Sequence, residues 1–157
     1  MAKGIIDRDL GLKRIIKQLK KIKNSTVTVG IHKDAGKYPT SSAPAVAYVG
    51  SIQEFGPEAH RVEFGPRPYM RPVFDKTTKR LTNIIKKGIN SVYAGRSTAK
   101  NVLDEVGKQH ASDIKNFLIQ DKVKPKTSPA VMEKKKTKIT LVETQKLHDS
   151  IRHKVKI

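Results

Sequence analysis

The sequence predicts an α+β fold in which a small, mostly antiparallel sheet packs against three or four helices. Its 157 residues suit one domain, and neither an internal repeat nor a clear linker divides the range 1–157. Apolar residues recur at helical spacing in several segments. Two further segments, one near each end, alternate apolar and polar residues in the manner of strands.

The first two elements are a basic helix and a strand. A helix is predicted over 10–23, because five apolar residues share one of its faces: Leu12, Ile15, Ile16, Leu19 and Ile22. Asp7 or Asp9 can cap this helix, and lysines near its C-terminal end suit the helix dipole. A strand with one buried face is predicted over 27–31, where Val27, Val29 and Ile31 alternate with Thr28 and Gly30.

A loop, a helix and a proline-rich strap should follow. The range 32–44 has glycine, proline and serine without periodicity, so it is predicted to be an exposed, mobile loop. The next helix ends before Gly56, and its expected inward face is Ala45, Tyr48, Val49, Ile52 and Phe55. The range 57–72 contains four prolines, so it should be a rigid, irregular strap in which 62–64 could form a short strand.

Two longer helices come next. The first is predicted over 73–93, with its inward residues at Phe74, Leu81, Ile84, Ile85 and Val92. Gly88 lies inside it and costs about 1 kcal/mol relative to alanine, which predicts a kink or close packing there. Ser97 or Thr98 caps the second helix, which should reach about Asp121 and turn inward Val102, Leu103, Val106, Ile114, Phe117 and Leu118.

The C-terminal part combines a basic arm with a short helix and a strand. The range 122–138 is rich in lysine, and Pro125 and Pro129 exclude a helix across it, so we expect an extended arm or loop. A short helix from about Thr144 should turn Leu147 and Ile151 inward. The strand 153–157 should then place Val155 and Ile157 on one face.

Charge is the strongest compositional signal. Lysine and arginine number 33 against 14 acidic residues, which gives a formal net charge of +19. Such an excess opposes a compact isolated domain and favours a polyanionic neighbour, although a solubility coat is the simpler alternative. The aromatic content of 5% without tryptophan argues against a membrane surface as that neighbour. No apolar stretch approaches a signal peptide or a membrane span, so we expect a protein made in the cytoplasm.

The usual catalytic groupings are missing from the sequence, which predicts a protein that is not an enzyme and needs no metal or cofactor. Without cysteine there is no disulfide, thiolate site or cysteine nucleophile. The five histidines never recur at i, i+4 spacing, and the acidic residues form no metal-binding cluster. His148, Asp149 and Ser150 are triad residue types, but neighbours on a helix should diverge. No motif for reading bases is present, so contacts with nucleic acid should be diffuse and salt-sensitive.

Three segments carry a resemblance in their order along the chain. They are Glu54-Phe55-Gly56, the run Pro66-Arg67-Pro68-Tyr69-Met70-Arg71-Pro72, and the C-terminal run from Leu141 to Ile151. This order resembles a family of small virion-morphogenesis proteins of long-tailed bacteriophages, the tail-component, neck or tail-completion proteins. Two positions depart from the family pattern: Gln145 stands where glycine is usual, and Tyr69 stands where phenylalanine is usual.

The resemblance implies a structural virion protein at the head–tail junction. Such a protein forms a sixfold or twelvefold ring that links the head connector or adaptor to the tail terminator or tail tube proteins. Viral DNA crosses the ring, so the lysines expected to face it are Lys134, Lys135, Lys136 and Lys138. The alternative is a host nucleic-acid-binding accessory protein, and a nuclease is disfavoured because no carboxylate cluster could hold magnesium.

The stiff strap is a candidate subunit interface, because its backbone has little conformational freedom left to lose on binding. Its arginines suit bidentate pairing with a carboxylate such as Glu54 or Glu58 across the interface. Alternatively, Phe55 and Met70 only fill the core of their own subunit. The expected interface residues are Glu54, Phe55, Arg67, Pro68, Tyr69, Met70 and Arg71.

Overall fold

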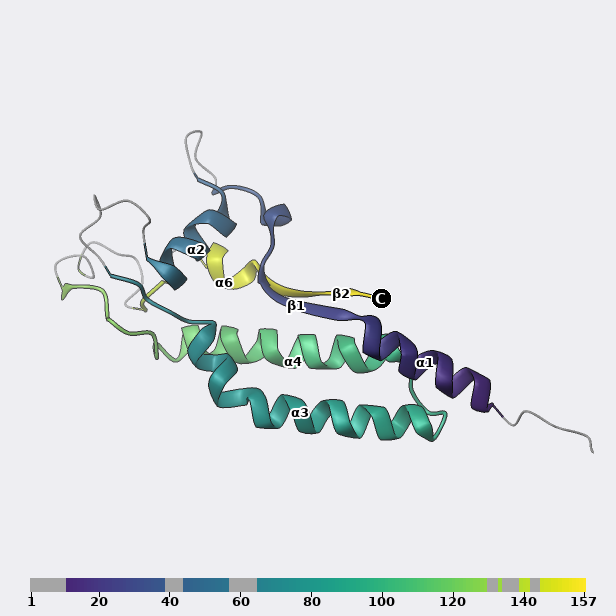
Figure 1. The fold of residues 1–157 in the computed structure, drawn as a ribbon. Coiled ribbons are helices and arrows are strands. Elements are labelled where there is room, and N and C mark those ends of the chain that lie inside the picture. Colours follow the sequence, from purple (N-terminus) through teal and green to yellow (C-terminus); the bar gives the residue numbers. More distant parts are fainter. Residues whose placement is uncertain (1–10, 39–43, 57–64, 130–132, 134–138, 142–144) are drawn as a thin grey trace, which may run out of the picture.

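The computed structural model describes residues 11–38, 44–56, 65–129, 133, 139–141 and 145–157. In chain order the elements are α1 (Leu12–Asn24), β1 (Thr26–Ile31), a 3₁₀ turn (Lys33–Ala35), α2 (Val46–Phe55), α3 (Arg71–Tyr93), α4 (Ala99–Ile119), α6 (Lys146–Asp149) and β2 (Ile151–Lys156) (Figure 1). Four of the five α-helices in these ranges are longer than one turn. The predicted α+β fold is confirmed.

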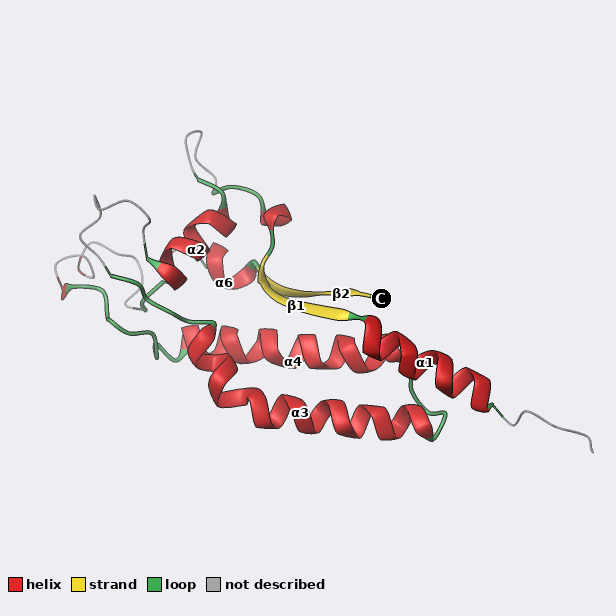
Figure 2. Ribbon diagram, viewed as in Figure 1, coloured by secondary structure: helices red, strands yellow, loops and turns green. Residues whose placement is uncertain are grey.

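The two strands bring together segments from opposite ends of the sequence. β1 and β2 form a two-stranded antiparallel sheet whose register runs from Thr26–Lys156 to Ile31–Ile151. α4 packs along one face of this sheet, and α3 lies against α4 on the far side, which gives three layers (Figure 2). Strand side chains alternate between the helix and solvent, as the period of a strand requires.

Two glycines allow these layers to approach closely. A Cβ atom added to Gly88 of α3 would lie 2.5 Å from a methyl group of Val102 on α4. A Cβ atom added to Gly107 of α4 would lie 2.5 Å from the His153 ring on β2. Any larger side chain would therefore push α4 away from its neighbours. The close packing predicted at Gly88 is confirmed.

The largest buried cluster lies where α4, the start of α3 and the C-terminal segment meet. It contains Tyr69, Val73, Ala111, Ile114, Leu118, Val123, Leu147 and Ile151. The range predicted as an extended arm or loop begins without helix or strand over 122–128, but Val123 within it is fully buried and not extended into solvent. A single apolar residue among lysines and prolines has no periodicity, which is why the sequence pattern missed it. The ranges 130–132 and 134–138 lie outside the described residues.

The inward face of α2 differs from the prediction. Its buried residues are Val46, Gly50 and Glu54, whereas Tyr48 and Phe55 are exposed. The buried stripe follows the expected i, i+4 spacing, but a glycine and a glutamate occupy two of its three positions. Of the five residues predicted to face inward, Ala45, Val49 and Ile52 are half-buried, so the count of apolar residues selected a face that is only partly covered. On α3, likewise, Phe74 is exposed beside the buried Val73.

Other boundaries shift by a few residues. Thr98 caps α4 by accepting a hydrogen bond from the Asn101 backbone N–H, as predicted. The predicted loop 32–44 contains the 3₁₀ turn and a bridge between Lys37 and Ala45, while 39–43 lies outside the described residues. The short strand proposed at 62–64 also lies outside them. β2 begins at Ile151 rather than at residue 153, because the last helix is a single turn.

Candidate subunit-interface site

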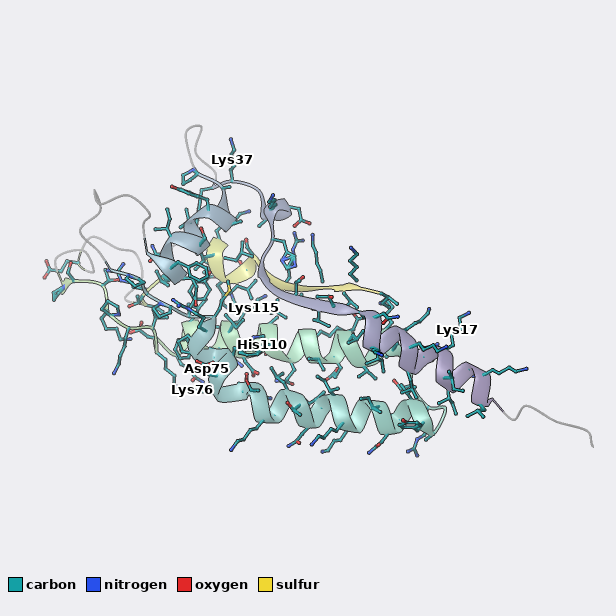
Figure 3. The ribbon with its side chains drawn as sticks, in the orientation of Figure 1. Lys17, Lys37, Asp75, Lys76, His110 and Lys115 are labelled. Carbon is teal, nitrogen blue, oxygen red and sulfur yellow. The ribbon has the colours of Figure 1, made fainter. Side chains whose placement is uncertain are left out.

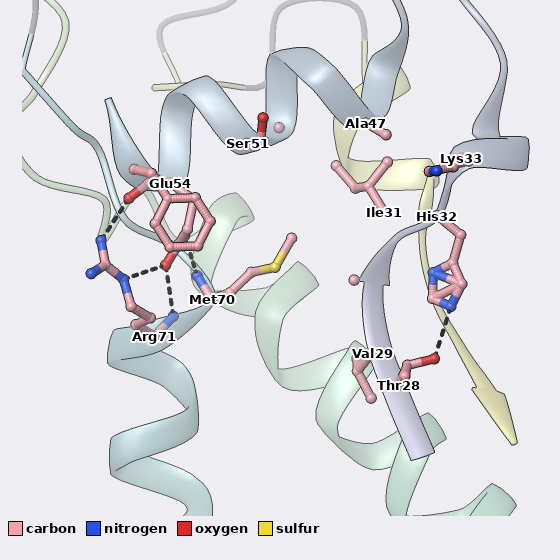
Figure 4. A pocket seen from close by; sticks show the side chains of 13 residues that line it. Thr28, Val29, Ile31, His32, Lys33, Ala47, Ser51, Glu54, Met70 and Arg71 are labelled. Atoms are coloured by element: carbon pink, nitrogen blue, oxygen red, sulfur yellow. Dashed lines mark hydrogen bonds and ion pairs between the residues drawn. The ribbon is translucent and has the colours of Figure 1, made fainter. Parts of the chain in front are cut away.

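A buried carboxylate joins the end of α2 to the start of α3. Glu54, only 2% exposed, accepts a hydrogen bond through its carboxylate from the backbone N–H of Tyr69 at 2.7 Å. The carboxylate also accepts hydrogen bonds from the backbone N–H groups of Met70 at 2.9 Å and Arg71 at 3.0 Å (Figure 4). The Arg71 guanidinium adds an Nε bond of 3.0 Å to the carboxylate and an Nη2 bond of 2.7 Å to the Glu54 carbonyl oxygen. We call these residues the Glu54 clamp.

The clamp satisfies the N-terminus of α3. That helix has no side-chain cap of its own, because Met70 occupies the cap position. The first N–H groups of a helix have no partners within the helix and carry partial positive charge. Glu54 supplies the missing acceptor from another helix. The sequence contained one signal for this arrangement, namely a long helix that starts without serine, threonine, aspartate or asparagine.

Electrostatics favour the ionised form of Glu54. Burial alone would raise its pKa, but the backbone N–H groups of Met70, Tyr69 and Arg71, together with the Arg71 guanidinium, outweigh burial and lower the pKa below its ordinary value. The carboxylate is therefore charged at neutral pH and bound within its own chain. The predicted pairing of Glu54 with an arginine across an interface is replaced by this intrachain pair, and Glu58 lies outside the described residues.

Tyr69 lies in the core of its own chain and not on a surface. It is fully buried, and burial raises the pKa of its phenol. Its hydroxyl, the group that phenylalanine would lack, lies 3.5 Å from the Gly50 carbonyl oxygen, which accepts its hydrogen bond. A Cβ atom on Gly50 would lie 3.0 Å from the same hydroxyl, so α2 can pack here only through glycine. Tyr69 therefore positions α2 and does not serve as an interface anchor.

Phe55 and Arg71 form the exposed part of the site. Phe55 is 68% exposed, so the alternative that it fills the core is wrong. The Arg71 guanidinium carbon lies 5.0 Å from the centroid of the Phe55 ring, within the range of a cation–π contact. The Arg71 side chain is 57% exposed although Glu54 holds two of its nitrogens. The clamp thus fixes a cation and an aromatic ring together at the surface.

A groove of about 480 Å³ lies beside this pair. Its walls are β1 on one side and α2 on the other, and the half-buried Met70 lies between them (Figure 4). Gly30 permits this packing, since a Cβ there would lie 3.3 Å from the Met70 sulfur. β2 pairs with one edge of β1, and no other strand of the described chain pairs with β1. We call this feature the Phe55–Arg71 groove.

The remaining predicted residues divide into two groups. Arg67 and Pro68 are half-buried, and the Arg67 N–H donates a 2.6 Å bond to the Gln53 carbonyl oxygen, which ties the strap to α2. The structure therefore brings all seven predicted interface residues together, although Glu54 and Tyr69 face inward. Lys134, Lys135, Lys136 and Lys138 lie outside the described residues.

Outside the Glu54 clamp and the Phe55–Arg71 groove, the described residues form no grouping that indicates a particular chemical activity. Within the described ranges, no group of three or more histidine, aspartate or glutamate side chains could hold a metal ion. His148 Nδ1 lies 2.8 Å from Asp149 Oδ1, so the prediction that these neighbours diverge is wrong. No helix in the part of the chain that the structure describes is long and apolar enough to cross a membrane. No family model matches the chain, and no match was found among curated proteins or solved structures.

Proposed function

We propose that this chain is a structural protein of the bacteriophage neck, one copy of a ring that links the head connector to the tail around the DNA channel. The observation that carries the proposal is the joining of two sequence motifs in one rigid unit. Glu54-Phe55-Gly56 and the strap from Pro66 to Pro72 are held together by the Glu54 clamp. The unit presents Phe55 and Arg71 at the surface.

The clamp supports an interface role because it organises its exposed residues in advance. Ordering an arginine on binding costs about 0.5–1.5 kcal/mol of side-chain freedom. Glu54 already restrains the Arg71 guanidinium beside Phe55, so most of this loss occurs on folding. Aromatic residues and arginine are also enriched at the centres of protein interfaces.

The groove supports a neighbouring copy as the occupant. A surface on one copy that binds a different surface on the next is heterologous, and a suitable rotation closes such contacts into a ring. An exposed strand edge beside an apolar groove can accept an extended segment. Copies that carry +19 each repel one another. DNA in the channel and acidic faces on the connector and tail proteins would offset this repulsion.

A basic nucleic-acid-binding accessory protein is the second candidate. The observation that favours it is the concentration of cations on α1, which has no acidic residue in its first turn. As a monomer or dimer, such a protein would bind free duplex without forming a ring. The two candidates therefore differ in the mass of the functional species and in its presence in virions.

The test is assembly of the purified chain, with and without duplex DNA, measured by light scattering after size exclusion and by negative-stain microscopy. We expect rings from the unaltered chain and a loss of rings for Phe55→Ala. Tyr93→Ala is the matched control, because Tyr93 is 58% exposed but lies at the far end of α3. A monomer under every condition, combined with its absence from purified virions, would overturn the proposal.

A further inference from the structure

α1 has the largest net positive charge of the helices and strands in the described chain. Its 13 residues include six cations and no acid: Lys13, Arg14, Lys17, Lys20, Lys21 and Lys23. The helix is strongly amphipathic, yet none of its residues is fully buried. It projects at one end of the molecule, beyond the sheet, and Lys17 extends outward from it (Figure 3). α1 therefore offers its polar side to a ligand.

Four of these lysines share one surface. Lys13, Lys17, Lys20 and Lys21 are spaced by four, three and one residues, which places them along one side of a helix. We call this surface the α1 lysine face. Together with Ile16 and the C-terminal Ile157 it borders a groove of about 630 Å³. The groove is thus bordered by four lysines and by two isoleucines, which combine positive charge with apolar surface.

Three of the four lysines of this face, Lys17, Lys20 and Lys21, have no carboxylate partner in the described part of the chain. The ion pairs in the described ranges join carboxylates to six lysine or arginine side chains, Arg71, Arg80, Lys100, Lys126, Arg152 and Lys154, and to two histidines, His148 and His153. None joins a carboxylate to Lys17, Lys20 or Lys21 within the described ranges. Like charges four residues apart on a helix destabilise it. The helix therefore keeps a local repulsion that an external polyanion would relieve.

We propose that the α1 lysine face binds the phosphate backbone of nucleic acid, independently of base sequence. Lysines spread along a helix suit a linear array of phosphates, and the apolar surface of the groove can pack against sugars. An anionic membrane is the other polyanionic surface. α1 lacks the aromatic residues that anchor interfacial helices, which favours nucleic acid over a membrane.

This inference deepens the proposed function, on which it rests for the identity of the ligand as DNA in the channel. It assigns the DNA contact to α1, near the N-terminus, whereas the sequence alone placed this contact at the lysines of 134–138. Because the α1 lysine face and the Phe55–Arg71 groove share no residue, each can be altered without the other.

The test compares two triple variants of the full chain for binding to a short duplex, followed by fluorescence anisotropy at about 50 and 200 mM salt. The first variant is Lys17→Gln/Lys20→Gln/Lys21→Gln. The control is Lys79→Gln/Lys86→Gln/Lys87→Gln, which removes the same three charges from exposed positions of α3. Circular dichroism checks that both variants keep their helices.

We expect the α1 variant to lose affinity by about tenfold or more, and the slope of log K against log salt to fall by roughly 2.7, since each phosphate contact contributes about 0.9. The α3 variant should change the slope by less than about one. An equal loss in both variants would mean diffuse attraction and would overturn the inference. So would an α1 variant that binds duplex normally but loses binding to phosphatidylcholine–phosphatidylserine vesicles.

The ring assay separates this inference from the proposed function. If the α1 variant loses duplex binding while the unaltered chain never forms rings or enters virions, the site stands and the neck role fails. If rings form and depend on Phe55 but the α1 variant binds duplex normally, the neck role stands and the site fails.

Discussion

Glu54 accepts hydrogen bonds from both the backbone N–H and the side-chain Nε of Arg71, each at 3.0 Å. A single carboxylate near the end of α2 thereby binds the first residue of α3. This relationship gives the two sequence motifs a structural meaning. The glutamate of the first motif caps the helix that follows the second, and the arginine of the second is held over the phenylalanine of the first. Several measurable consequences depend on it.

Replacing Glu54 with glutamine should destabilise the fold. The change removes the charge and turns an amide N–H₂ toward backbone N–H donors, so at least one buried donor is left without an acceptor. We expect a loss of about 2–4 kcal/mol in the free energy of unfolding, measured with urea. Glu105→Gln, at an exposed position of α4, should change it by less than about 0.5 kcal/mol. Equal stability of the two variants would show that the clamp contributes nothing.

Acid should lower the free energy of unfolding, partly by protonating Glu54. The folded state lowers the pKa of Glu54 from its ordinary 4.5, so its contribution is complete above pH 4.5 and is lost as pH falls toward the folded-state value. Lysine and backbone partners also lower the pKa of Asp121, so part of the decline will remain without Glu54. Urea unfolding from pH 6 to about pH 3 should therefore show a shallower decline for Glu54→Gln than for the unaltered chain. Identical slopes would contradict the assignment.

Replacing Gln145 with glycine should make the protein more stable. Gln145 precedes α6 with φ 56° and ψ −10°, the left-handed conformation that disfavours side chains with a Cβ atom. The chain keeps this turn with a residue other than glycine and therefore tolerates its strain. Gln145→Gly should raise the melting temperature and add about 1 kcal/mol to stability. Gln145→Ala retains the Cβ atom and should give no gain, which distinguishes relief of strain from loss of a side-chain contact.

The contact between α3 and α4 can be tested at Gly88. Alanine is the better helix former by about 1 kcal/mol, but its Cβ atom would lie 2.5 Å from Val102. We expect the clash to dominate and Gly88→Ala to destabilise the fold by about 1–3 kcal/mol in urea unfolding. Adding Val102→Ala should recover part of this loss despite the smaller core side chain. If the double variant loses more free energy of unfolding than the two single variants lose when their losses are added, the clash is ruled out.

The long elements could be predicted from the sequence because periodicity determines them. Five apolar residues spaced along one side defined α1, alternation defined β1, and Thr98 marked the start of α4. In β1 and α4 the residues that face the core are mostly the apolar ones, whereas Leu12 and Ile16 of α1 are exposed. Local pattern and tertiary packing agree in β1 and α4, and the boundaries of all three elements fall within about two residues of those predicted.

The candidate site was harder to predict because polar residues do the packing there. The buried side of α2 contains Gly50 and Glu54, which score as neutral and hydrophilic. Glu54 is buried only because the start of α3 offers it N–H donors, a partner 15 residues away for which no local pattern gives evidence. Val123 was missed for a similar reason, since only the tertiary fold shows what covers it. Sequence order identified the right residues for the site but not the direction in which each one faces.

The pairing of Thr28 with Lys154 in the sheet joins positions that are 126 residues apart. By contrast, α3 and α4 are joined by a turn of a few residues and can meet early in folding. The strands can pair only after a very long loop has closed, which is entropically unfavourable until α4 provides an apolar surface for them. We therefore expect the sheet to be the last part of the domain to form. Amide protons in β1 should exchange through local opening of the sheet, before those in the middle of α4.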